Sequence, residues 1–108
     1  MLIRPHILVL TAGRGEPLRQ LCAGIEEEGV PFEVRRGTPG TAASLAVEAA
    51  RRSPLGVGVG LDATGLIVVH HSKLPDTQPV TRTREARRAG RHAARIVTGT
   101  PLDLEENR

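Results

Sequence analysis

The feature that most restricts the fold is a stretch in which glycine alternates with apolar residues. Residues 55–61 read Leu-Gly-Val-Gly-Val-Gly-Leu. Because side chains on a β-strand alternate between its two faces, a strand here places Gly56, Gly58 and Gly60 on one face and larger apolar side chains on the other. A face without side chains lets another backbone come very close, so we expect a helix or a partner protein to pack against it.

The rest of the chain alternates between strand and helix patterns. The order β-α-β-α-β-β-α predicts one small layered α/β domain over residues 1–102, with a mostly parallel sheet covered by helices, and a polar tail over 103–108. The predicted strands cover residues 7–10, 31–36, 55–61 and 66–70, and the predicted helices cover 16–28, 41–52 and 83–97. We expect the strand at 7–10 to be buried on both faces, the strand at 31–36 to lie at an edge, and residues 72–81 to form a loop.

Composition excludes several classes of protein. No apolar run approaches the length of a membrane-spanning helix, and no signal peptide is readable, so we expect no contact with a membrane. The single cysteine, Cys22, cannot form an internal disulfide, which favours a reducing compartment and a cytoplasmic location. With one Phe and no Trp or Tyr, the chain cannot build the aromatic platforms of many ligand and single-strand nucleic-acid sites.

The local motifs give weak support to catalysis or cofactor binding. Glycines at 56–60 do not match a dinucleotide loop, because Leu61 stands where the third glycine is needed and a turn follows instead of a helix. The loop at 11–16 lies where many α/β proteins bind anions, although an ordinary connection is the simpler interpretation. His70 and His71 are adjacent on a strand and point to opposite faces, which argues against a shared zinc ion.

A run of three glutamates ends the first predicted helix. The apolar stripe of that helix lies opposite Glu27, which is flanked by Gln20, Ala23 and Gly24. We therefore expect Glu27 to project outward from a flat surface of small residues. Such a carboxylate is either a solvated side chain or a ligand for a hard cation shared with another protein.

Arginines gather on one half of the last predicted helix. These residues can contact phosphates, an acidic partner or water, and a protein contact or a solvated face is the favoured interpretation. A basic helix without base-reading context gives little support for nucleic-acid binding, which stays as an alternative. The arginines are Arg84, Arg87, Arg88, Arg91 and Arg95.

Three groups of residues, in colinear order, together resemble a known family. They are Gly24-Ile-Glu-Glu-Glu-Gly-Val-Pro-Phe32, then Ala49-Ala-Arg-Arg-Ser-Pro-Leu-Gly-Val-Gly-Val-Gly60 with Val68-Val-His-His-Ser-Lys-Leu-Pro75, and finally Ala93-Ala-Arg-Ile-Val-Thr-Gly-Thr-Pro101. The combination resembles the small subunit of the diol and glycerol dehydratase-reactivating factor. That family also includes the medium subunit of the cobalamin-dependent dehydratases.

The resemblance implies a Rossmann-like fold and a non-catalytic role. In that family the small subunit pairs with a large, chaperone-like ATPase subunit, and the complex releases damaged cobalamin from a dehydratase by subunit exchange. ATP and adenosylcobalamin would then belong to the partners, and this chain alone would bind no cofactor. A microcompartment location also follows from the family, and an isolated small subunit is expected to be able to form a homo-oligomer.

The resemblance also implies a set of interface residues. Glu27 would contribute to a divalent cation, Mg²⁺ or Ca²⁺, at the interface with the large subunit, with Glu26 or Glu28 in that role if the correspondence shifts by one. The expected partner surface also includes the glycine face of residues 56–60. Its other members are Gln20, Ala23, Gly24, Glu27, Arg84, Arg88, Arg91 and Arg95.

The main alternative within the family is a medium subunit of the dehydratase itself. The medium subunit is longer, and it has a lysine-bearing turn near the cofactor where this chain has Asp62-Ala-Thr-Gly65, which favours the reactivating factor. One departure concerns the last helix, where His92 replaces the asparagine that is usual in the family. The choice between a diol and a glycerol dehydratase stays open.

Overall fold

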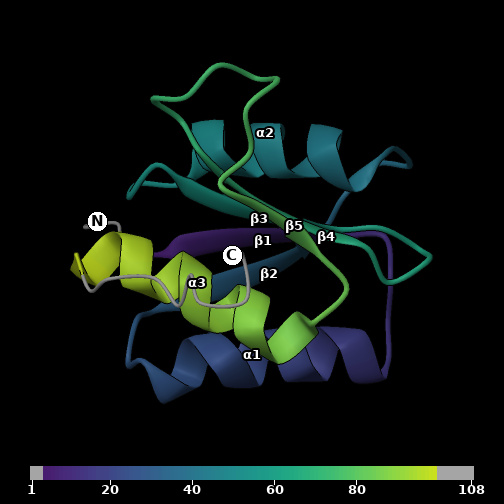
Figure 1. Ribbon diagram of the computed structural model, residues 1–108, viewed down its shortest axis with the longest axis horizontal. Helices are drawn as coiled ribbons and strands as arrows, with labels where there is room; N and C mark the ends of the chain where they lie inside the picture. The colour runs from purple at the N-terminus through teal and green to yellow at the C-terminus, as the bar shows by residue number, and fades with distance from the viewer. Residues whose placement is uncertain (1–3, 100–108) are drawn as a thin grey trace, which may run out of the picture.

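Two helical layers enclose a mixed β-sheet. The computed structural model describes residues 4–99. Within that range, the elements are β1 (Ile7–Thr11), α1 (Glu16–Glu27), β2 (Phe32–Arg36), α2 (Ala42–Arg52), β3 (Val57–Leu61), β4 (Ile67–His71), β5 (Thr81–Thr83) and α3 (Ala86–Thr98). The sheet has the strand order β2-β1-β3-β4-β5. Figure 1 shows α2 on one face of this sheet and α1 with α3 on the other.

The predicted α/β fold is confirmed, and its central strands behave as the sequence indicates. All five residues of β1 are buried, and β1 pairs in parallel with both β2 and β3. Local signals set the helix ends. The Thr41 hydroxyl accepts a hydrogen bond from the Ser44 amide at 3.0 Å and caps α2, while Gly29 takes a left-handed conformation just after α1.

The glycine face of β3 is covered by α2. A Cβ atom added to Gly58 would lie 2.1 Å from the Ala50 backbone nitrogen, and one added to Gly60 would lie 2.2 Å from the Ala42 carbonyl oxygen. The helix therefore packs backbone against backbone. Of the two expectations for this face, the helix is confirmed and the partner protein is wrong, because α2 occupies the face. Gly56 precedes β3 with a φ of 73° and faces Ser72 instead.

The two sides of the sheet bury different side chains. On the α2 side, small residues of the helix and the glycines of β3 leave room for Leu8, Leu10 and Leu45. The larger core lies on the side of α1 and α3, where Leu21 and Ile25 of α1 meet apolar residues of the strands. The strand residues of that core are Ile7, Val9, Val57, Val59, Leu61, Ile67 and Val69.

The prediction missed one strand. Thr81–Thr83 pairs antiparallel with β4 at the end of the segment that was expected to be a loop. Three residues rich in threonine and arginine carry too short a pattern to be recognised. As a result α3 begins at Ala86 instead of residue 83, and the sheet is evenly mixed instead of mostly parallel.

The tail expected at 103–108 lies outside the described residues. Over residues 4–99, none of the helices has both the length and the apolar character that crossing a bilayer requires.

We predict that Gly58→Ala destabilises the protein by about 1–3 kcal/mol, because the new methyl group would force α2 away from β3. Urea or thermal unfolding measures the effect. Gly40→Ala is the matched control, since a Cβ there would come close to the Ser44 hydroxyl, at 2.9 Å, which can rotate away, and would lie at an ordinary 3.9 Å from the Thr38 carbonyl oxygen. Equal stability of the wild-type protein and Gly58→Ala would contradict the close contact.

Candidate protein-interaction site

Helices α1 and α3 touch through a pair of glycines. A Cβ atom added to Gly24 would lie 2.0 Å from the Arg87 carbonyl oxygen, and one added to Gly90 would lie 2.2 Å from the Leu21 carbonyl oxygen. Both glycines are buried. The small residues of α1 therefore serve contact with α3. The expected flat surface around Gly24 is wrong, because α3 covers it.

Polar pairs continue this contact along both helices. Gln20 bonds to Arg87, Glu27 lies near Arg91, and Glu28 lies near Arg95. Because the residue numbers rise together along both helices, α1 and α3 run in the same direction. Their amino ends lie at one end of the sheet (Figure 1). We call this line of contacts the α1–α3 seam.

Glu27 lies in this seam and does not project freely into solvent. Its Oε1 atom accepts a hydrogen bond from Nε of Arg87 at 2.7 Å, and a terminal nitrogen of Arg91 lies 3.6 Å away. The hydrogen bond from Arg87 lowers the pKa of Glu27, and the same contact raises the pKa of Arg87. The Glu27 side chain keeps 40% of its exposure, so it can still be reached from outside.

The residues around Glu27 do not form a metal site on their own. The described residues contain no group of three His, Cys, Asp or Glu side chains that could hold a metal ion. Divalent cations such as Mg²⁺ need several oxygen ligands, and two arginines beside Glu27 oppose a bound cation. Glu27 can supply at most one carboxylate to a cation, so the other ligands of any such site would have to come from another protein.

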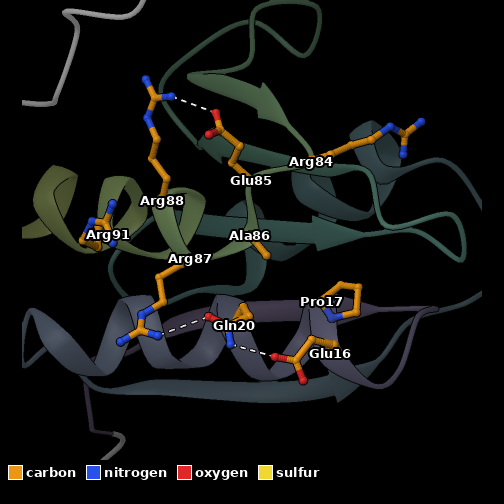
Figure 2. A pocket seen from close by; sticks show the side chains of 9 residues that line it. All are labelled: Glu16, Pro17, Gln20, Arg84, Glu85, Ala86, Arg87, Arg88 and Arg91. Carbon is orange, nitrogen blue, oxygen red and sulfur yellow. Dashed lines mark hydrogen bonds and ion pairs between the residues drawn. The ribbon is translucent and has the colours of Figure 1, made fainter.

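An open groove of about 480 Å³ lies between the amino ends of α1 and α3 (Figure 2). Pro17 and Ala86 contribute apolar surface, and the rest of the lining is charged or polar. The lining holds four arginines and two glutamates, and Glu27 beside it pairs with Arg87 and Arg91, so the groove carries a small excess of positive charge. The other lining residues are Glu16, Gln20, Arg84, Glu85, Arg87, Arg88 and Arg91.

The arginines of the groove point in different directions. In Figure 2, Arg87 reaches toward Gln20 on α1, whereas Arg88 turns the opposite way to Glu85, at 2.9 Å. Arg84 lies apart from both and bonds to Thr64 in the turn after β3. A compact anion needs donors that converge on one point. This arrangement instead suits an extended, acidic protein surface that meets several charges at once.

The structure brings together part of the predicted partner surface. Four of its residues line the groove, namely Gln20, Arg84, Arg88 and Arg91. Glu27, Ala23 and Arg95 lie along or beside the seam, and Gly24 is buried within it. Sequence reasoning missed the part played by Arg87, because its carboxylate partner is 60 residues away in the chain. The sequence feature that points to this contact is the face of small residues on α1, which allows the arginine-bearing helix α3 to pack closely.

The residues of the weaker motifs make contacts within the fold. Burial raises the pKa of the Cys22 thiol, which disfavours the reactive thiolate. His70 is buried with Nε2 3.1 Å from the Pro75 carbonyl oxygen, while His71 is partly exposed and accepts a hydrogen bond from the Lys73 amide. In the loop after β1, the Thr11 hydroxyl bonds to both backbone groups of Gly13.

Comparison with known proteins places the chain among dehydratase-associated subunits. A family model described as "Dehydratase medium subunit" matches residues 4–103. The chain is 38% identical to the diol dehydratase-reactivating factor small subunit of Klebsiella michiganensis, over 78% of this chain and 71% of that protein. It is 39% identical to the propanediol dehydratase-reactivating factor small subunit of Salmonella typhimurium, over 77% and 76% of the two chains.

Solved structures agree with these relatives. A chain of a glycerol dehydratase reactivase superposes with a TM-score of 0.83 and 34% identity, covering 93% of this chain and 97% of the other. A chain of the diol dehydratase-reactivating factor complexed with ADP and Mg²⁺ gives the same score and identity, covering 94% and 99%.

We predict that the carboxyl group of Glu27 titrates below its ordinary pKa of 4.5, because Arg87 stabilises the ionised form. The ion pair is then complete at neutral pH and is lost as the pH falls through the lowered pKa of Glu27. Carbon-13 NMR of the glutamate carboxyl groups measures this directly. Arg87→Gln should move the midpoint of Glu27 upward, whereas Arg51→Gln on α2 should leave it unchanged. A midpoint of Glu27 at or above 4.5 in the wild-type protein would refute the pairing.

Proposed function

Because this chain belongs to the dehydratase medium subunit family, we propose that it is the small subunit of a diol or glycerol dehydratase-reactivating factor. One observation carries this assignment. Chains from two solved reactivating factors superpose on this structure at 34% identity, and each superposition covers more than nine-tenths of this chain and of the other chain. A medium subunit of a dehydratase is the other candidate, favoured by the description of the family model.

In this role the chain acts through contacts with other proteins and carries out no chemistry itself. Its partner is the large subunit of the factor, which carries the ATPase, and the complex acts on a dehydratase whose cobalamin is damaged. A small subunit that shares its fold with the medium subunit of the dehydratase can compete for the same contact. ATP and adenosylcobalamin are bound by the partners, in the cytoplasm or within a bacterial microcompartment.

We assign the contact with the large subunit to the groove and the neighbouring α1–α3 seam. The groove is open and positively charged, and its arginines are spread out, which suits a broad acidic surface. The glycine contact of α1 with α3 fixes how far apart the two helices lie, so the backbone needs little rearrangement on binding. In the complex, the Glu27 carboxylate exchanges its hydrogen bond from Arg87 for a divalent cation whose remaining ligands come from the large subunit.

We predict that Arg84→Glu weakens binding to the large subunit by about tenfold or more, because it reverses a charge at the rim of the groove. Co-purification and titration calorimetry with the large subunit measure the change. Arg51→Glu is the matched control, since Arg51 is exposed on α2 at the opposite face of the sheet. Equal binding by all three proteins would exclude the groove as the contact.

The same titration tests the role of Glu27. If Glu27 shares a cation with the large subunit, a chelator weakens the wild-type complex, and Glu27→Gln weakens it without further sensitivity to the chelator. Glu26→Gln, a neighbouring exposed glutamate, should bind like the wild-type protein. If chelator does not change the affinity of the wild-type complex, the shared cation is excluded, while the assignment of the chain as the small subunit is unaffected.

A further inference from the structure

The outer edge of β2 is unpaired among the described strands. β2 lies at the end of the sheet and pairs only with β1. The Ile7 amide donates to the Pro31 carbonyl, and the Gly37 amide donates to the Thr11 carbonyl, both at 3.0 Å. Backbone groups of a strand alternate between its two edges, so residues 31, 33, 35 and 37 bond toward β1. The amides and carbonyls of Phe32, Val34 and Arg36 therefore point outward.

The side chains of β2 are divided between the faces of the sheet. Glu33 and Arg35 pair in register with Leu8 and Leu10, so they lie on the α2 face. Phe32, Val34 and Arg36 lie on the other face. Val34 is 37% exposed, and among the large apolar residues of the described range only Leu74 is exposed to the same extent. Glu33 and Arg35 keep 40% and 54% of their side-chain exposure.

This strand is complementary to itself. In an antiparallel pair of two copies centred on Val34, the outward backbone groups of Val34 face each other, and those of Phe32 face Arg36 of the second copy. These are the residues that exchange hydrogen bonds in such a ladder. Between them, Glu33 lies opposite Arg35 of the second copy at both ends. Opposite charges at facing positions stabilise a pair of strands.

We propose that β2 is the interface of a homodimer, in which two copies of this chain join their sheets through antiparallel β2 strands. Charged side chains on an edge strand usually protect it from pairing. Here the same charges select a second copy of this chain over other strands, because the second copy places an opposite charge beside both Glu33 and Arg35. Two strands of five residues bury far less area than a standard stable interface, so the dimer is weak and forms at high protein concentration.

The homodimer is separate from the proposed contact with the large subunit. No residue of β2 lines the groove between α1 and α3. Within the chain, Glu33 already contacts Arg35 at 2.7 Å and His6 at 3.0 Å. The second copy adds a further arginine beside this cluster without requiring its loss.

Charge exchange at β2 tests the interface in the full chain. Sedimentation equilibrium over a concentration series should show a dimer that Glu33→Arg or Arg35→Glu weakens on the order of tenfold, because each change places like charges opposite one another twice. The double variant Glu33→Arg with Arg35→Glu restores opposite charges and should recover the dimer. A monomer at every concentration, or a dimer that these single changes leave intact, would overturn the proposal.

Two further measurements keep the test independent of folding. Val34→Pro removes an outward amide without touching the bonds to β1, so it should abolish the dimer while the circular dichroism spectrum is retained. In the wild-type protein, hydrogen exchange should slow with concentration at Val34 and Arg36 and not at Glu33 and Arg35. Val34→Pro should still bind the large subunit. If it loses that binding, the edge of β2 also belongs to the large-subunit contact, and the separation of the two contacts is refuted.

Discussion

Contacts between backbones, made possible by four glycines, determine where the helices α1, α2 and α3 lie. Gly58 and Gly60 let α2 pack on β3, and Gly24 and Gly90 let α1 and α3 pack against each other. Each position is too close to another backbone to accept a Cβ atom. Because dispersion and burial depend on such close packing, these glycines help a chain with one aromatic residue to form its core.

The same contacts place the polar residues that we associate with function. Since α1 and α3 run side by side in the same direction, Glu27 meets Arg87 across the seam, and the amino ends of both helices border one charged groove. The described residues offer no cluster suited to holding a metal alone. A rigid surface with spread charges is what a subunit needs when its work is to bind other proteins, and this agrees with the proposed role in a reactivating factor.

Periodicity was enough to predict most of the fold. Alternation at 55–61 and the helical stripe beginning at Leu18 have clear physical consequences, so β3, α1 and the class of fold follow from local sequence. The surface was harder to predict. A small-residue face accepts either a helix or a partner protein, and nothing near Gly24 reveals that α3 returns to cover it. β5 was missed because three residues carry too little pattern.

The most direct test is the recovery of an inactivated dehydratase. A diol or glycerol dehydratase with damaged cobalamin is mixed with the large subunit, ATP and adenosylcobalamin, with or without this chain, and its activity is followed. If the chain is the small subunit of the reactivating factor, dehydratase activity recovers only when the chain and the large subunit are both present. Full recovery without the chain would contradict the assignment. So would dehydratase activity when the chain is mixed with the catalytic subunits in place of their medium subunit.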